Sequence, residues 1–322
     1  MSVEIPQPVV KEAVRQLLWP GGDYRLQIVN SINAMFFNFV MEFLEEIGKA
    51  KIKNKTIDND WYKTVFMDER LPSNEIAINA GINMKTISNI CGKGDKNTVI
   101  DASQVNYDSV KQIVSNLVQD NNDMDLTITI KTRSGEIDLD INESLVVINA
   151  IAVKRAALRG GIWSSIGKRA EKPLMLALCY LYEVSPDNYA IKQLKEDGKA
   201  TYKREIDFFL IGKERANAKK LKRFKCEIKL MGRGNPESAD AVVARESRVF
   251  VADTLLKNTI AQLESLNVEW VALKEENGYR RFATVLENLN IPHKPYDGNL
   301  EDDMDEIIEK AFLPHEHVIF TD

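Results

Sequence analysis

The spacing of apolar residues changes partway along this chain, and that change constrains the fold more than any other feature. In the first half, apolar residues recur every three or four positions, as in residues 24–47, which is the period of an amphipathic helix. In the second half, short β-prone runs such as 204–211 and 224–231 alternate with helical stretches. The pattern predicts an α+β chain, with a helical N-terminal module followed by an α/β module.

The N-terminal module, residues 1–142, is expected to be helical with one β-hairpin. In residues 125–141 the apolar residues alternate first with threonines and then with aspartates, and Arg133-Ser134-Gly135 lies between the two runs. Such alternation around a turn predicts a hairpin. The helices of this module are expected at 9–18, 24–47, 73–81, 84–91 and 107–119.

The C-terminal module, residues 143–322, is expected to contain a sheet with covering helices, because strand and helix patterns alternate there. The boundary between the modules is expected within residues 142–160. Helices are predicted at 143–159, 165–183, 254–266 and 279–290, with Pro173 inside the second. Strands are predicted at 204–211, 224–231, 240–244, 248–252 and 268–273.

The net charge of −5 over 322 residues conceals an uneven distribution. Residues 192–233 carry 14 Lys or Arg against 6 acids, whereas residues 297–322 carry 1 Lys against 9 acids. A basic middle segment favours a polyanionic partner. With no apolar run long enough for a membrane span, no signal peptide and three well-separated cysteines, a cytoplasmic protein is expected.

Residues 73–91 have the pattern of a helix-turn-helix unit. Ala77 is the small residue that the helix crossing needs, Gly81 suits a positive-φ turn, and Ile76, Ala80, Ile82, Ile87 and Ile90 occupy the inward positions. The second helix would then present outward the residues Asn83, Lys85, Thr86, Ser88 and Asn89. These side chains can bond base edges and phosphates in a major groove, although a plain helical hairpin would give the same pattern.

Two acids and a lysine are predicted to meet on neighbouring strands of the C-terminal module. Glu227 and Lys229 lie two apart on one strand and therefore share a face, while Ile228 points to the other. If the strand that carries Asp207 pairs with it, Asp207 meets Glu227. Two close carboxylates repel and favour a bound cation, and oxygen ligands suit Mg²⁺. The alternative is a solvated Glu/Lys face on an edge strand.

Such a cluster suits phosphodiester hydrolysis, since a divalent metal neutralises charge on the phosphate and helps to deprotonate the attacking water. A second acid-x-Lys triplet, Asp197-Gly198-Lys199, has no strand around it. Residues 160–290 resemble the PD-(D/E)XK nuclease superfamily and, within it, the type II restriction endonucleases. The sequence departs from the family pattern at Ile206, where the family name implies a proline that members frequently lack.

The resemblance implies a restriction-endonuclease-like core with an Mg²⁺ ion held by Asp207, Glu227 and the Ile228 carbonyl, and it implies that Lys229 handles the attacking water. It further implies a glutamate from the preceding helix, for which Glu171 is the candidate, with Glu205 as a substitute. The cations expected to grip DNA near this site are Lys222, Arg223 and Arg233.

The leading functional prediction is a type II restriction endonuclease that hydrolyses double-stranded DNA at a specific sequence with Mg²⁺. A homodimer is expected, because a two-fold protein reads a two-fold site, and a DNA methyltransferase is expected in the same system. The alternatives are a non-catalytic helix-turn-helix regulator and a structure-specific repair or recombination nuclease with the same core.

Overall fold

The computed structural model forms two compact units. The N-terminal unit comprises residues 30–162, and the C-terminal unit comprises residues 5–29 and 163–322. The residues described are 5–54, 60–120, 125–133, 135–194, 207–230, 242, 246–313 and 318–321, with only the backbone at 54, 192–194, 207 and 318–321. That residues 1–142 and 143–322 fold as separate domains stays a prediction.

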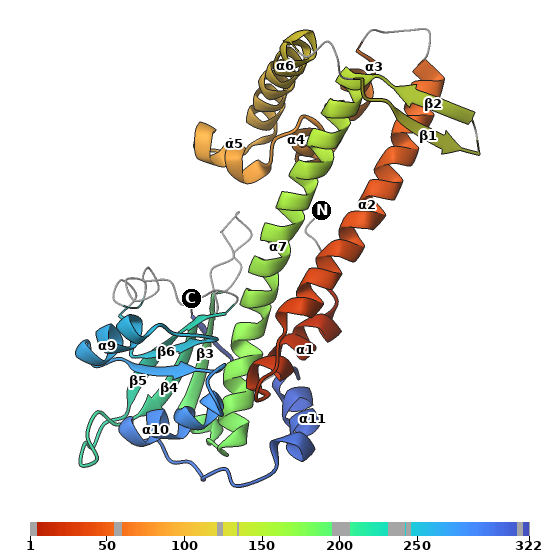
Figure 1. Cartoon of the computed structure of the whole chain (residues 1–322). Coiled ribbons are helices and arrows are strands. Elements are labelled where there is room, and N and C mark those ends of the chain that lie inside the picture. The colour runs from red at the N-terminus through yellow and green to blue at the C-terminus, as the bar shows by residue number, and fades with distance from the viewer. Residues whose placement is uncertain are drawn as a thin grey trace. The chain divides into compact units, whose positions relative to one another are not determined.

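The N-terminal unit is helical apart from one hairpin (Figure 1). Its elements are α2 (Arg25–Asn54), α3 (Trp61–Phe66), α4 (Ser73–Asn79), α5 (Met84–Cys91), α6 (Lys96–Asp120), β1 (Ile128–Thr132), β2 (Gly135–Leu139) and α7 (Ile141–Leu181). Both α2 and α7 continue into the C-terminal unit. The hairpin has the predicted alternation, since Ile130 pairs with Ile137 and both are buried.

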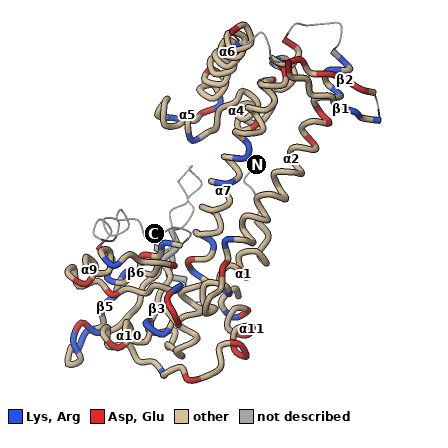
Figure 2. The backbone as a smooth tube through the Cα atoms, in the orientation of Figure 1, with Lys and Arg blue, Asp and Glu red and all other residues tan. Residues whose placement is uncertain are grey.

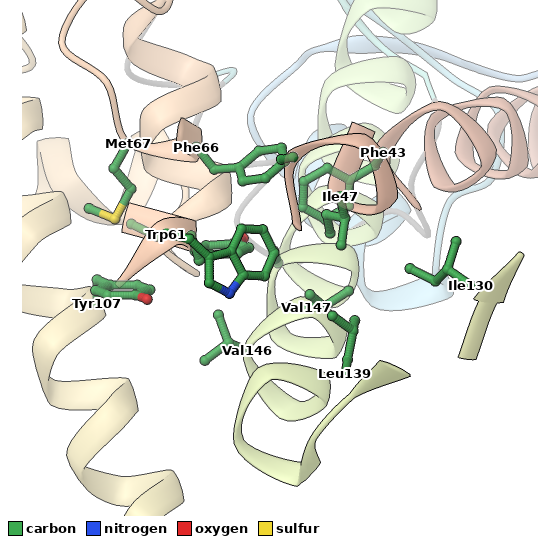
Figure 3. Close-up of a cluster of buried hydrophobic side chains, with 14 of the residues drawn as sticks. Phe43, Ile47, Trp61, Phe66, Met67, Tyr107, Ile130, Leu139, Val146 and Val147 are labelled. Atoms are coloured by element: carbon green, nitrogen blue, oxygen red, sulfur yellow. The ribbon is translucent and has the colours of Figure 1, made fainter. Parts of the chain in front are cut away.

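Aromatic and aliphatic side chains from six elements form the core of the N-terminal unit (Figure 3). Phe43 and Ile47 of α2 meet Trp61 and Phe66 of α3, and Val147 of α7 is fully buried among them. Each such side chain contributes roughly 1.5–3 kcal/mol through burial. The one polar atom of Trp61 is satisfied as well, because Nε1 donates to Glu143 over 2.8 Å.

The C-terminal unit is built on a mixed six-stranded sheet in the order β7-β6-β5-β4-β3-β8. The strands are β3 (Tyr189–Leu194), β4 (Asp207–Gly212), β5 (Lys222–Lys229), β6 (Val249–Ala252), β7 (Glu269–Ala272) and β8 (Val318–Thr321). The helices are α1 (Gln7–Leu18), η1 (Pro186–Asn188), α9 (Lys257–Ser265), η2 (Gly278–Arg280), α10 (Arg281–Asn288) and α11 (Leu300–Ala311). Strand β4 is antiparallel to both β3 and β5, and the other pairs are parallel.

The two faces of β5 differ in chemistry. Phe224, Cys226 and Ile228 are buried on one face, where the Cys226 thiol lies near the Cys179 thiol of α7. Burial raises the pKa of Cys226 to about 12. Glu227 and Lys229 alternate with these residues and therefore belong to the opposite face. The sheet thus presents its charged residues away from the α7 side.

The expected helices 143–159 and 165–183 are one helix, α7, and that part of the prediction was wrong. Pro173 removes one backbone hydrogen bond and costs about 3 kcal/mol in a helix interior. Residues 174–179 after it are all fully buried, and this packing outweighs the proline. Helix α6 begins at Lys96, earlier than expected, with Asp95 accepting from the Thr98 backbone N–H.

The sequence did not predict α3, β3, α11 or β8. The strand expected at 240–244 lies outside the described residues, except for Val242. The remaining expected strands of the sheet are present, with bounds that differ by at most three residues.

Candidate functional site

Strands β4 and β5 are antiparallel neighbours, as the candidate site requires. Phe208 pairs with Cys226, and Phe209 pairs with Lys225. The same register continued by one position sets the Asp207 backbone opposite Glu227. Residues directly opposite in an antiparallel pair stand on one face of the sheet. The Asp207 side chain itself lies outside the described residues.

The Glu227 carboxylate is almost completely withdrawn from water, with 5% of its side chain exposed. A carboxylate in such a place is costly unless a cation compensates it. Lys229 supplies one, because its Nζ lies 3.1 Å from Glu227 Oε1 while 38% of its side chain stays exposed. The pair therefore combines a shielded acid with a lysine that still reaches solvent.

The other predicted ligands occupy different positions. The Ile228 side chain is buried on the Cys226 face, as the strand alternation requires. Glu171 is half-buried on α7, eight residues before Cys179, which packs near Cys226. Glu205 lies outside the described residues. Within the described part of the chain, no three His, Cys, Asp or Glu residues converge as a metal site would require.

A buried carboxylate that sequence reasoning missed lies at the end of β6. Ala252 pairs with Lys229, and Asp253 follows it with none of its surface exposed. Tyr24 Oη donates to Asp253 Oδ2 over 2.5 Å, and an Arg25 nitrogen lies 3.1 Å from the same oxygen. The sequence signal that could have revealed Asp253 is its position directly after the four apolar residues of β6. Asp253 joins the segment before α2 to the strand that neighbours Lys229.

The predicted DNA-gripping cations begin strand β5. Lys222 and Arg223 are both exposed, and Lys222 Nζ lies 2.7 Å from a Glu214 carboxylate oxygen. Arg233 and the glycines beside it lie outside the described residues. Two of the three predicted cations are thus on the strand that carries Glu227.

Helices α4 and α5 form a compact pair in the N-terminal unit. Ala77, Ile76 and Ile87 are fully buried, and Gly81 has a φ of +81° between the two helices. The Asn83 side chain caps α5, because its Oδ1 accepts from the Thr86 N–H.

The outward residues of α5 lie mostly as expected. Lys85, Ser88 and Asn89 are exposed, while Thr86 is half-buried and its hydroxyl donates to Asn83. The inward placement of Ile90 was wrong, since 73% of it is exposed. Helix α5 packs through Ile87 and Met84, and its last turn extends past that contact.

A cavity of about 170 Å³ lies in the N-terminal unit, where Trp61, Tyr107 and Val146 line it together with charged residues. Of its charged groups, Asp60 pairs with Lys111 at 3.2 Å and Glu143 pairs with Lys51, while Asp140 accepts a hydrogen bond from the Glu143 backbone N–H. None of the predicted site residues lines this cavity.

A family model described as CfrBI restriction endonuclease matches residues 7–259, which is most of the chain. The chain belongs to the CfrBI restriction endonuclease family. This membership supports the prediction that the protein is a type II restriction endonuclease, which is a nuclease whose substrate is DNA. No curated protein and no solved structure matches the chain.

The segment shared with the CfrBI family contains both the α4–α5 pair and the strand with Glu227 and Lys229. It ends within α9, before β7, α10 and α11. In the described part of the chain, every helix is too short or too polar to cross a membrane.

Proposed function

We propose that this CfrBI-family protein is an Mg²⁺-dependent endonuclease of the PD-(D/E)XK type that cleaves double-stranded DNA at a specific sequence. The observation that carries the proposal is the buried Glu227 carboxylate beside Lys229, on the strand next to the one that begins with Asp207. In this proposal Asp207, Glu227 and Lys229 share one face of the sheet.

The chemistry of these groups fits a magnesium ion. Mg²⁺ takes oxygen ligands and keeps several waters, so one or two carboxylates suffice. Glu227 offers a carboxylate that is shielded from bulk water, and Asp207 and the Ile228 carbonyl would complete the protein ligands. When bound, Mg²⁺ would neutralise charge that develops on the scissile phosphate and lower the pKa of a coordinated water.

Lys229 has two roles in the proposed reaction. Its ammonium compensates the Glu227 charge, and its exposed part can orient the attacking water and stabilise the phosphate. Glu171, on α7, is proposed as a further acid that positions the metal-bound waters from the neighbouring helix.

Sequence recognition is proposed to involve α5. Lys85, Ser88 and Asn89 project from it into solvent, with Thr86 between them. Their hydrogen-bonding groups match base edges and phosphates of the major groove. A homodimer would present two such helices to the halves of a palindromic site, and a DNA methyltransferase of the same specificity would protect the host.

Digestion of plasmid DNA with and without Mg²⁺ tests the proposal. Discrete fragments that require Mg²⁺, with ends that map to one short sequence, are the expected result. Lys229→Ala should lose cleavage and keep DNA binding, whereas Lys294→Ala, an exposed lysine paired with Glu183, should cut like the wild type. Full cleavage by Lys229→Ala would refute the assignment. Cleavage that depends on DNA structure would identify a repair-type nuclease, and binding without cleavage a regulator.

A further inference from the structure

One stretch of α7 is basic and contains no acid of its own. Residues 144–170 contain five Lys or Arg and no Asp or Glu, although the chain as a whole has a net charge of −5. Figure 2 shows blue segments along this helix. Three of the five cations, Lys154, Arg155 and Arg159, belong to the N-terminal unit. An acid-free cationic stretch in an acidic protein favours an anionic partner.

These three cations do not share one environment. Lys154 turns toward α2, where its Nζ lies 4.4 Å from the centre of the Phe39 ring. Arg155 and Arg159 are exposed, one helical turn apart. The Arg155 guanidinium also contacts the Phe36 ring at 5.1 Å, which fixes it without neutralising its charge.

Neither arginine has a carboxylate partner within the described residues. Other cations of the same unit do, since Lys51 pairs with Glu143 and Lys63 with Asp108. Arg155 and Arg159 are thus two neighbouring exposed cations that no carboxylate of the described residues pairs with.

The residues beside the two arginines have small side chains and are exposed to solvent. The exposed positions Ala152, Ala156 and Gly160 recur on the same side of the helix. Gly160 and Gly161 lie in the helix interior, where each costs about 1 kcal/mol relative to alanine. No atom lies within 4 Å of where their Cβ atoms would be, so packing inside the chain does not explain them. A partner molecule that approaches the helix backbone closely would explain why both positions are glycine.

We infer that Arg155 and Arg159, with Ala152, Ala156 and Gly160, form a contact surface for the phosphate backbone of duplex DNA. This α7 basic face rests on the proposed function, which makes DNA the substrate. A second copy of the chain is a poor occupant, because a two-fold contact through this face would set arginine against arginine. DNA supplies the complementary charge, and small side chains let its backbone approach the helix.

Binding of a non-specific DNA fragment, measured in EDTA over a range of salt concentrations, tests the inference. Each phosphate contact contributes roughly 0.9 to the slope of log affinity against log salt. The variant Arg155→Ala/Arg159→Ala should therefore make the salt dependence shallower. The magnitude of the slope should fall by about 2, equally for all DNA sequences. The control Lys49→Ala/Lys310→Ala removes the same charge from two exposed intrahelical ion pairs and should leave the slope unchanged.

Two further variants separate charge from shape. Arg155→Lys/Arg159→Lys should keep the slope, and Gly160→Ala should raise thermal stability while it weakens binding. A wild-type slope in the double alanine variant, or the same change in the control, would overturn the inference. If the wild type fails to cut with Mg²⁺ but the double alanine variant still has the reduced salt slope, the nuclease proposal fails and the α7 basic face stands. Normal cutting with no slope change refutes only the face.

Discussion

Removing the Tyr24 hydroxyl should destabilise the C-terminal unit far more than an ordinary surface change. Tyr24 is fully buried, and its Oη donates over 2.5 Å to Asp253, which is also fully buried. Tyr24→Phe keeps the ring and its edge contact with Trp163, and it removes the hydroxyl that makes this hydrogen bond. It leaves a buried carboxylate with one fewer donor.

The size of the effect follows from the charge. A hydrogen bond to an ionised group contributes about 1.5–3 kcal/mol, roughly twice a neutral one. The Thr254 N–H and Arg25 still bond Asp253 in the variant, so we expect a loss of about 2 kcal/mol. Asp253→Ala, which also orphans the tyrosine hydroxyl and Arg25, should cost about 3–5 kcal/mol.

Equilibrium urea denaturation of the full chain measures these free energies of unfolding. Tyr296→Phe is the matched control, because its hydroxyl donates over 2.8 Å to the half-buried Asp303, and it should cost about 1 kcal/mol or less. Equal small losses for Tyr24→Phe and Tyr296→Phe would refute the reasoning, since burial of Asp253 would then carry no energetic weight.

Three further predictions concern other parts of the chain. Gly81→Ala should lower the free energy of unfolding by at least about 1–2 kcal/mol, because φ is +81° and the added Cβ meets Asn149, and a wild-type melting temperature would contradict this. Titration with a thiol reagent should modify only the exposed Cys91 in the native state and all three cysteines after unfolding, because Cys179 and Cys226 are buried. The Arg25 backbone N–H lowers the pKa of Asp23 below its usual 3.8, so its stabilising effect is present above that pH and disappears on acidification. The free-energy difference between the wild type and Asp23→Asn should therefore shrink below pH 4, and a constant difference would show that the pairing has no effect.

The strands that carry the candidate site could be predicted because their signals are local. Residues 207–212 and 222–229 are short β-prone runs, and the two-residue spacing of Glu227 and Lys229 places both on one face in any strand. Their pairing was a hypothesis, and the observed register of Phe208 with Cys226 is the one that it required.

Features that depend on tertiary packing could not be read in this way. The apolar pattern predicted a break between helices at residues 160–164, but α7 continues through them and through Pro173, and residues 174–179 after the proline are fully buried. Ile90 fitted the inward position of a motif, but no element covers the last turn of α5 within the described residues. Asp253 became recognisable only once Tyr24, more than two hundred residues earlier, was seen to contact it.

A double-mutant cycle on the cleavage rate tests most directly whether Asp207 and Glu227 act on one ion. Asp207→Asn and Glu227→Gln should each slow Mg²⁺-dependent cleavage by at least about 100-fold, because either loss empties a shared site. The double variant should then be no slower than the slower single variant, since groups that act as a unit are not additive. Independent, multiplying losses, or wild-type cleavage by either single variant, would contradict the proposed site.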